Sequence, residues 1–281
     1  MDLEGFSQPF PAPAKLNLML RVVGRRADGY HLLQTVFRFI DCVDTLRFRV
    51  REDGVIHRMN GIAGVPADTD LCVRAARALQ AASGTLLGAD IYLEKQLPMG
   101  GGLGGGSSDA ATTLMALNVL WRTALSRRQL MVLGEKLGAD VPVFVFGESA
   151  FAEGIGEQLQ ALALPSSWYV VLCPPVESPT ARIFAHPELK RDSKKVTIQG
   201  FSSHPPVNDL EPVVSRLYPE VARHLAWLGR YGEAMMTGSG ACVFAPFAGE
   251  AEARLVLQHL PPGMRGFVAR GLDRHPLHDL I

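Results

Sequence analysis

A run of glycines near the middle of the chain is the stretch whose composition most directly suggests chemistry. In the segment LPMGGGLGGGSSDAATTLMALN (97–118), glycine occupies six of the seven positions from 100 to 106. Fixing a glycine in regular structure costs about 0.5–1 kcal/mol more than fixing an alanine, so such a run needs a compensating use. Because glycine has no Cβ, its backbone can approach an anion closely, and the unpaired N–H groups of a helix start bind phosphate. The run therefore suggests a phosphate-binding loop.

The sequence on either side distinguishes such a loop from a flexible linker, the usual role of a glycine-rich run. The preceding ADIYLEKQL is typical of a strand, and the segment that follows has apolar residues at helical spacing. A strand, a tight loop and a helix start form a fixed unit rather than a tether. Ser107 and Ser108 stand where they could cap this helix, with hydroxyls that could reach phosphate oxygens or a bound metal ion.

Three well-known phosphate loops do not fit this sequence. A Walker loop needs a lysine directly after its last glycine, and none follows here. Gly100, Gly102 and Gly105 match the dinucleotide pattern G-x-G-x-x-G, but so rich a run matches it trivially. No acidic residue stands about twenty positions further on to hold a ribose. A protein-kinase loop would need H-R-D and D-F-G downstream, and neither string occurs. The loop is therefore of another kind.

Composition and charge are those of an ordinary globular protein. The 281 residues suffice for one large or two modest domains, with 47% hydrophobic and 20% charged residues. Lys+Arg and Asp+Glu both number 28, so no basic surplus is available to hold nucleic acid. The four cysteines lack C-x-x-C spacing, which favours reduced thiols in a cytosolic protein. The sequence shows no secretion signal and no apolar run of about 18–20 residues. We therefore expect a cytoplasmic protein that does not span a membrane.

The elements around the glycine loop alternate without a regular βαβ repeat. AKLNLMLRVVG is typical of a strand, and DGYHLLQTVFRFIDCVDTLRFRV of two strands around a turn. We expect a helix from about Asp70 to Ser83, ended by Gly84, and a later helix after a capping box of Ser126 and Gln129. The second half offers the strand WYVVLCPP, a hairpin in AMMTGSGACVFAPF, a helix and the strand GFVARGL. This order predicts an α+β fold with two domains, 1–164 and 165–281.

Five blocks of the sequence resemble the GHMP family of small-molecule kinases. In order they are PAPAKLNLML, DGYHLLQTVF, LPMGGGLGGGSSDAA, GADVPVFVFG and MTGSGACVF, and they run from residue 11 to residue 244. The resemblance implies an N-terminal domain like domain 2 of ribosomal protein S5, a ferredoxin-like C-terminal domain and an active site in the cleft between them. The pairing of PAKLNL with DGYH is similar to members that act on an alcohol linked to cytidine diphosphate. It implies ATP as phosphoryl donor and the 2-hydroxyl of a methylerythritol unit as acceptor, a step of non-mevalonate isoprenoid biosynthesis.

The resemblance also implies a catalytic pair. Asp140, in GADVP, matches the family's catalytic aspartate, which accepts the hydroxyl proton or orients the hydroxyl. Lys15 matches the active-site lysine, which pairs with that aspartate and neutralises charge on the transferred group. Asn17, two residues further along the same strand face, could hold a substrate hydroxyl. From the residues alone, a helix cap would be favoured for Asp140, a solvated position for Lys15 and an edge position for Asn17.

The acceptor site is implied by a second group of residues. Tyr30 and His31 match the pair that sandwiches and recognises cytosine in the family. An aromatic face stacks on any base, and hydrogen bonds then select one. Without the other blocks, the two residues would be an ordinary strand start after a turn. Thr180 and Phe184 fall where the family has further substrate contacts, and the segment 237–240 either supports the reaction centre or is only a hairpin turn.

The resemblance assigns the glycine block and its flanks to ATP. The residues that it implies are Lys95, Pro98, Met99, Gly100, Gly101, Gly102, Leu103, Gly104, Gly105, Gly106, Ser107 and Ser108. Lys95 is equally well explained as a solvated lysine at a strand end. None of the eight histidines shows metal-ligand spacing, so we expect Mg²⁺ to come with ATP and to be held mainly by phosphates and water. Asp70 departs from the family, in which asparagine is common beside the adenine, and this leaves the base contact open.

Three alternatives compete with this assignment. They are another GHMP kinase with a different small alcohol, a non-catalytic ATP-binding sensor of the same fold, and an RNA-binding module, since S5-type domains also occur in ribosomes. The presence of both Lys15 and Asp140 disfavours the sensor, and zero formal charge disfavours the RNA-binding module. We therefore expect ATP and a small-molecule substrate as partners, without nucleic acid or membrane. A weak homodimer is left open.

Overall fold

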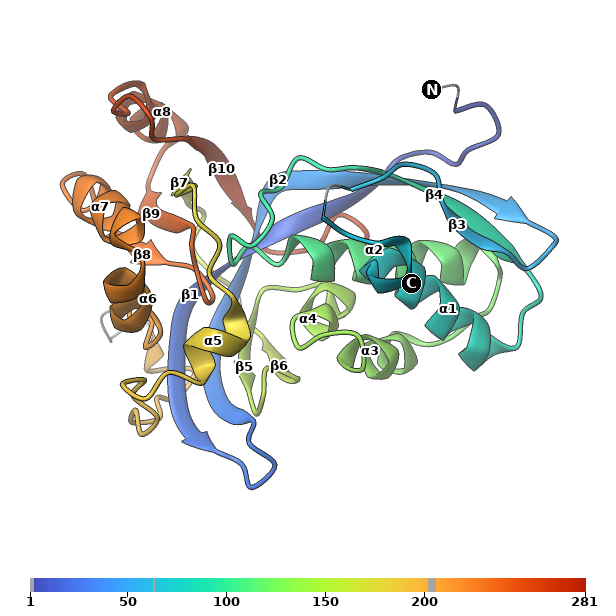
Figure 1. The fold of residues 1–281 in the computed structure, drawn as a ribbon, viewed down its shortest axis with the longest axis horizontal. Coiled ribbons are helices and arrows are strands. Elements are labelled where there is room, and N and C mark those ends of the chain that lie inside the picture. Colours follow the sequence, from blue (N-terminus) through green and yellow to red (C-terminus); the bar gives the residue numbers. More distant parts are fainter. Residues whose placement is uncertain (1–2, 63, 202–205) are drawn as a thin grey trace.

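Two long antiparallel strands run through the whole molecule, β1 (Phe10–Arg25) and β2 (His31–Arg51) (Figure 1). The computed structural model describes residues 3–62, 64–201 and 206–281. β2 belongs to a ten-stranded sheet whose main order is β3-β4-β2-β10-β7-β9-β8, with β1 and β5 also paired to β2 and β6 paired to β5. The sheet extends through two lobes, each with its own helices (Figure 1).

β2 is one strand of 21 residues, so the prediction of two strands around a turn is wrong. Its register with β1 shifts by two residues at Asp41 and Cys42, which form a bulge. A bulge bends a strand and increases its twist without ending the pairing. Asp41 supplies an acceptor to a neighbouring strand instead of starting a turn, because its Oδ1 accepts the N–H of Arg270 at 2.7 Å.

In the first lobe, four helices cover one face of the sheet, and α2 packs between β1 and the other three helices (Figure 1). Residues 110–117 of α2 are buried all round, as expected for a central helix. The elements of this lobe beyond β1 and β2 are β3 (Ile56–Arg58), η1 (Ala67–Thr69), α1 (Leu71–Ser83), β4 (Gly88–Glu94), α2 (Gly105–Leu120), α3 (Arg127–Glu135), α4 (Val141–Phe146), β5 (Ala150–Glu153), β6 (Gln158–Ala161) and η3 (His278–Leu280).

The second lobe is a smaller antiparallel sheet covered by helices. β10 pairs with both β7 and β2 and so joins the two parts of the sheet. Leu20 and Val22 of β1 pack in the core of this lobe, although they are far from it in sequence. Its elements are β7 (Trp168–Leu172), α5 (Thr180–Phe184), α6 (Glu211–Leu217), α7 (Pro219–Leu228), β8 (Met235–Met236), β9 (Val243–Phe247), α8 (Glu250–Gln258) and β10 (Gly266–Leu272).

The local signals for helix ends are confirmed. The carboxylate of Asp70 accepts N–H groups from the first turn of α1, and Gly84 ends that helix in the left-handed conformation with φ +72°. Ser126 and Gln129 form the expected capping box at α3. The strand 168–172, the hairpin of β8 and β9, the helix α8 and the strand 266–272 are also present. The predicted α+β class is therefore confirmed.

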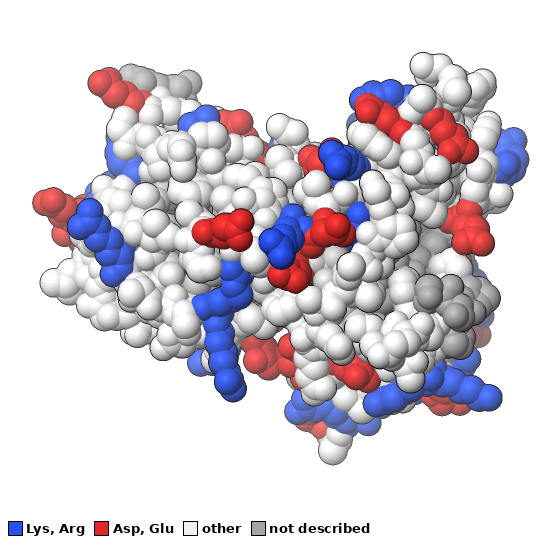
Figure 2. Space-filling model, turned by 180° about the vertical axis from the view of Figure 1, so that it is seen from behind, with Lys and Arg blue, Asp and Glu red and all other residues white. Residues whose placement is uncertain are grey.

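The surface carries both signs of charge. On the face shown in Figure 2, Lys and Arg side chains are interspersed with Asp and Glu, and neither sign forms a continuous field. Within the described residues, no helix combines the length and apolar character needed to cross a bilayer.

Candidate active site

Two adjoining cavities lie between the lobes. The first, of about 540 Å³, is lined by the glycine loop and by the parts of β1, α1 and the β8–β9 hairpin that face it. The second, of about 560 Å³, lies beside the start of β2 and α5. The residues that line both cavities, and so make them continuous, are Leu33, Ala139, Ile155, Thr180 and Phe184.

The glycine loop has a backbone that only glycine adopts readily. Gly100, Gly102 and Gly104 have φ of +67°, +75° and +73°, the left-handed region in which a side chain is strained. A Cβ on Gly102 would also lie 2.2 Å from the carbonyl oxygen of Thr237. The loop ends in α2, which starts at Gly105. The expected unit of strand, tight loop and helix start is confirmed, and the linker alternative is excluded.

The prediction that Ser107 and Ser108 cap α2 is wrong. The helix starts before them, with Gly104 at the N-cap, so both serines lie within its first turn. Ser107 still lines the first cavity. Ser108 is buried, and its Oγ has no hydrogen-bond partner among the described residues. Glycine at the helix start leaves the first N–H groups of α2 uncovered by side chains, as an anion site requires.

Lys15 lines the first cavity, and three oxygen atoms hold its ammonium group. Its side chain is only 2% exposed, which excludes the solvated alternative. Nζ lies 2.6 Å from Asn17 Oδ1, 2.9 Å from the carbonyl oxygen of Gly102 and 3.2 Å from Asp140 Oδ2. These contacts match the three donors of an ammonium group. They connect the lysine to its own strand, to the glycine loop and to the start of α4.

Asp140 lies at the N-cap position of α4 but does not cap it. In the described chain its carboxylate makes no capping hydrogen bond, so the alternative favoured by the residues alone is wrong. The side chain is 35% exposed, lines the first cavity and pairs with Lys15. One carboxylate oxygen faces the ammonium, and the group is accessible to a molecule in the cavity. The structure thus brings together the two residues expected to form a catalytic pair.

Asn17 supports Lys15 from the same face of β1. Its side chain is 2% exposed, its Oδ1 accepts from Lys15, and its Nδ2 donates to Thr35 Oγ1 at 2.8 Å. The backbone N–H of Asn17 donates to Thr237 Oγ1 at 3.0 Å. The segment 237–240 is therefore more than a hairpin turn, because it contacts the strand that carries the lysine.

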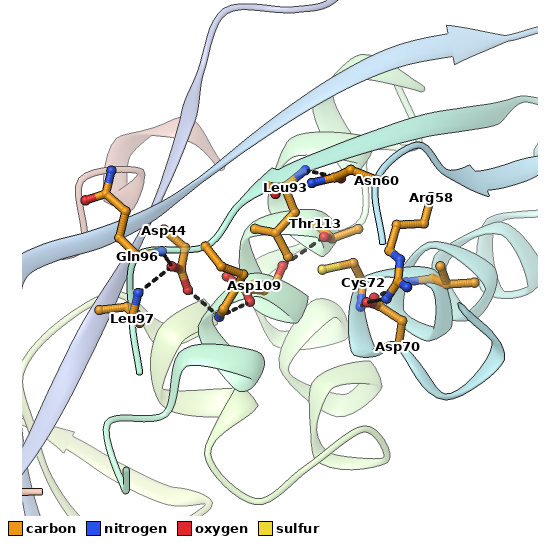
Figure 3. A network of polar contacts seen from close by, with 12 residues as sticks. Asp44, Arg58, Asn60, Asp70, Cys72, Leu93, Gln96, Leu97, Asp109 and Thr113 are labelled. Atoms are coloured by element: carbon orange, nitrogen blue, oxygen red, sulfur yellow. Dashed lines mark hydrogen bonds and ion pairs between the residues drawn. The ribbon is translucent and has the colours of Figure 1, made fainter. Parts of the chain in front are cut away.

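A charged network fixes the two ends of the glycine loop, and Figure 3 shows its residues Asp44 and Asp109. Asp44 is fully buried, and its Oδ1 accepts the N–H groups of Gln96 and Leu97, at 2.6 and 2.8 Å, where the chain enters the loop. Lys95 Nζ lies 2.5 Å from Asp44 Oδ2 and 2.8 Å from Asp109 Oδ2, the latter on α2 after the loop. Two carboxylates therefore hold Lys95, and the alternative of a solvated lysine at a strand end is wrong.

The charge balance of this network is unusual. Two buried carboxylates share one ammonium, and Asp109 Oδ1 has no partner among the described residues. Burial is the largest cause of a raised pKa at Asp109, and with the nearby Asp44 it outweighs Lys95 and brings that pKa to about 7. Lys95 lines the cavity, but both carboxylates already hold its ammonium.

Asp70, the departure from the family pattern, has two structural partners. Its Oδ1 accepts the N–H of Cys72 at 2.7 Å, and its Oδ2 lies 2.6 Å from Arg58 Nη1 (Figure 3). The residue is 3% exposed and lines the first cavity. An aspartate here therefore acts as a helix cap held by an arginine, and this ion pair explains why the charge is tolerated.

The second cavity contains the expected acceptor residues. Tyr30 is 61% exposed at its mouth, and the His31 ring lies 5.0 Å from that of Phe184, centroid to centroid, at an interplanar angle of 36°. Thr180 Oγ1 lies 2.7 Å from Ser239 Oγ. An aromatic lining with a few polar groups is typical of a site for a flat ligand.

Arg191 also lines this cavity, and the sequence analysis missed it. Its Nε donates to His31 Nε2 at 3.0 Å. Burial lowers the pKa of His31, and the charges of Arg191 and Arg25 lower it further. The only signal for Arg191 in the sequence is a charged run, LKRDSKK, which looks like a solvated loop.

Comparison with known proteins identifies the class of this site. Residues 70–148 match the GHMP kinases N terminal domain, and residues 193–262 match the GHMP kinases C terminal model. The chain belongs to the GHMP kinase family. Within this family, the chain is similar to a Thiobacillus denitrificans protein called 4-diphosphocytidyl-2-C-methyl-D-erythritol kinase, and the two are 63% identical over 275 residues. The aligned region covers 98% of this chain and 99% of the relative. An Azoarcus protein with the same name is 57% identical over the full length of both.

Solved structures agree with this result. A crystal structure of 4-(cytidine 5'-diphospho)-2C-methyl-D-erythritol kinase superposes with a TM-score of 0.81 at 35% identity, over 94% of this chain and 99% of that one. A mevalonate kinase superposes with a TM-score of 0.69 at 17% identity, and this match shows the fold alone. The two-domain kinase fold implied by the resemblance is confirmed, and the protein is an ATP-dependent small-molecule kinase.

Proposed function

We propose that this protein transfers the γ-phosphoryl group of ATP to the 2-hydroxyl of 4-diphosphocytidyl-2-C-methyl-D-erythritol, the kinase step of non-mevalonate isoprenoid biosynthesis. Full-length relatives that carry this enzyme's name support the substrate. The observation that carries the proposal is the Lys15–Asp140 pair, 3.2 Å apart. It lies in a cavity that has the glycine loop on one side and opens into an aromatic-lined cavity on the other.

ATP is proposed to bind with its phosphates on the glycine loop. The first N–H groups of α2 point out of a helix start that has no side-chain cap in the described chain, and they would bind phosphate oxygens. In the described residues, no three His, Cys, Asp or Glu side chains gather to hold a metal ion. The cavity does offer hard oxygen donors at Ser107 and Asp140, which suit Mg²⁺ already bound to the phosphates. When bound, the ion would neutralise phosphate charge.

The transfer step uses Asp140 and Lys15. The acceptor hydroxyl oxygen forms a bond to the γ-phosphorus, the bond from that phosphorus to the ADP oxygen breaks, and the hydroxyl proton passes to Asp140. Lys15 stabilises negative charge on the phosphoryl group and keeps the carboxylate in place. Asn17 and the Gly102 carbonyl hold the ammonium in one position, so little reorganisation is needed during transfer.

The cytosine ring is proposed to occupy the second cavity. Tyr30, exposed at the mouth, and Phe184, packed against His31, offer aromatic faces for stacking. Stacking on an aromatic residue contributes about 1–3 kcal/mol per base. The ring of His31 and nearby backbone groups would supply the hydrogen bonds that distinguish cytosine from other bases.

A kinase assay tests this function. The wild-type protein should release ADP with the cytidylyl alcohol and not with 2-C-methylerythritol, mevalonate or homoserine. Tyr30→Ala should raise KM for the cytidylyl substrate about ten- to a hundredfold, as expected for one lost stacking contact, with KM for ATP nearly unchanged. Tyr231→Ala, at a part-exposed tyrosine that packs on Trp227, is the matched control. Equal turnover of the simple alcohols would refute the cytidylyl assignment and leave only the broader kinase class.

Three further statements rest on the sequence and the resemblance. We propose a cytoplasmic location, supported by four free cysteines, which are typical of a reducing compartment. Domain extents of 1–164 and 165–281 stay a prediction, as does a weak homodimer.

A further inference from the structure

Arg191 ties three segments of the chain together around the second cavity. It follows α5 in a stretch without regular structure. Besides its bond to His31, Nη1 donates to the Leu189 carbonyl at 2.9 Å, and Nη2 donates to the carbonyls of Phe184 and His186 at 3.0 and 2.8 Å. All three guanidinium nitrogens are therefore engaged, and the plane of the group is fixed. The side chain that contacts His31 is thus itself held rigidly.

The contact determines where His31 carries its proton. A guanidinium has N–H donors and no acceptor, so His31 Nε2 accepts through its lone pair, at 3.0 Å from Arg191 Nε. A neutral imidazole whose Nε2 accepts has its proton on Nδ1. A doubly protonated ring would direct an N–H group at the guanidinium and is therefore disfavoured.

The charges around His31 favour the same neutral ring. Burial and the cations Arg191 and Arg25 lower its pKa from 6.5. The carboxylate that also lines the cavity, Asp28, is engaged elsewhere, by the N–H of Tyr30 at 3.2 Å and by Arg26 Nη2 at 2.7 Å. His31 is thus a neutral imidazole with a single remaining N–H donor.

We propose that Arg191 is a specificity-determining residue, which selects cytosine over uracil by fixing the proton of His31 on Nδ1. This inference rests on the proposed function and deepens it. Cytosine N3 is an acceptor, whereas uracil carries a hydrogen on N3 and is a donor there. A ring that offers only a donor can bond to cytosine N3 and meets an opposing donor in uracil. A bound base would cover this donor, and a covered donor without an acceptor costs about 1–3 kcal/mol, so discrimination of about 5- to 150-fold is expected.

The proton position can be tested without any substrate. In the wild type, ¹⁵N chemical shifts of the His31 ring, assigned by the loss of their signals in His31→Gln, should show protonated Nδ1 and unprotonated Nε2. Arg191→Met should release this constraint and raise the His31 pKa towards 6.5. Arg25→Met removes a nearby positive charge without removing the hydrogen bond, so it should leave the tautomer unchanged. A wild-type ring protonated on Nε2 would overturn the inference directly, even if Arg191→Met did not fold.

Kinetics supply the second readout. The ratio of kcat/KM for the cytidylyl substrate to that for its uridylyl analogue should fall about fivefold or more in Arg191→Met, while KM for ATP stays near wild type. The matched control is Lys190→Met, at an exposed cation next to Arg191 that lines neither cavity, and it should keep the wild-type ratio. Arg191→Lys keeps a donor-only group and should retain part of the discrimination. An unchanged ratio in Arg191→Met would refute the role of Arg191. A wild type that does not phosphorylate the cytidylyl substrate would instead refute the proposed function, and the NMR result would still decide the tautomer.

Discussion

Alanine at Gly104 and alanine at Gly106 should change the stability of the protein in opposite directions. Gly104 has φ +73°, and its Cβ would lie 3.0 Å from Phe144 Cζ and 3.1 Å from Lys15 Cε, both on buried side chains. The left-handed conformation alone costs about 1–2 kcal/mol for a residue other than glycine. Gly106 lies in the first turn of α2, and its Cβ would meet only Leu71 Cδ1, at 3.4 Å. Alanine there should stabilise the protein by about 0.4–1 kcal/mol.

Both substitutions should nevertheless weaken ATP binding. Gly106 is exposed and lines the first cavity, where the phosphates are proposed to approach the start of α2. A methyl group at this position would keep the phosphates from close contact with the backbone. We expect at least a tenfold loss of ATP affinity in Gly106→Ala, equivalent to about 1.4 kcal/mol. Higher stability together with weaker binding would separate the role of this glycine in the ligand site from any role in the fold.

Urea denaturation without ligand and calorimetric titration with ATP would measure the two effects. Gly249→Ala is a suitable control, because a Cβ at Gly249 would have nothing within 4 Å and the position is remote from the loop in sequence. It should leave ATP affinity unchanged. If Gly106→Ala bound ATP as tightly as the wild type, the phosphates would not lie on the start of α2, and the proposed donor site would be wrong.

Further predictions concern the catalytic pair, the loop network and pH. Asp140→Asn should lower kcat about 10²–10⁴-fold with ATP affinity retained, since a positioned base contributes that much, and adding Lys15→Ala should cost less than the sum of the single changes. Near-normal turnover in Asp140→Asn would exclude it as the base. Asp44→Asn should raise KM for ATP more than Asp90→Asn, an equally buried carboxylate that pairs with Arg49 and Arg51 instead of holding the glycine loop. Equal effects would leave Asp44 a purely structural role. Burial lowers the His275 pKa to about 3, so unfolding takes up a proton below pH 6.5. The stability from His275 is then lost as pH falls, by up to about 1.4 kcal/mol per unit between pH 6 and pH 3. In His275→Asn, the free energy of unfolding from urea titrations at several pH values should lack this pH-dependent slope. An unchanged slope in the variant would show that His275 does not cause it.

Much of the fold follows from local sequence signals. Glycine, serine and aspartate at helix ends act through their nearest neighbours, so the ends of α1 and α3 could be predicted. The single strand β2 could not. Its polar residues Asp41 and Asp44 resemble a turn, and their partners Arg270 and Leu97 are far away in sequence. A bulge whose polar groups are satisfied by distant segments leaves no periodic pattern to detect.

The candidate site, like the fold, could be predicted from local sequence signals only in part. The family motif identifies Asp140 as a candidate catalytic residue. The residues alone favour a helix cap at this position, because the contact with Lys15 joins segments 125 positions apart and leaves no local pattern. Serine favours the N-cap position, which predicts caps at Ser107 and Ser108, whereas the helix begins earlier, at Gly105. Arg191 was missed because its role depends on His31, a partner from another segment. Long-range pairs of this kind are set by the fold and not by spacing in the sequence.

The placement of Leu20 and Val22 in the core of the second lobe affects how the molecule unfolds. β1 extends from the first lobe into the second, where these two side chains pack in the core. β10 pairs with strands of both lobes. A polypeptide ending at residue 164 would keep both side chains but lose the surface that covers them, and we expect it to aggregate. Heating the intact chain should give one calorimetric transition whose van't Hoff and calorimetric enthalpies agree. A destabilising substitution anywhere in the core of the second lobe would then lower the amount of folded kinase in the cell, even far from both cavities.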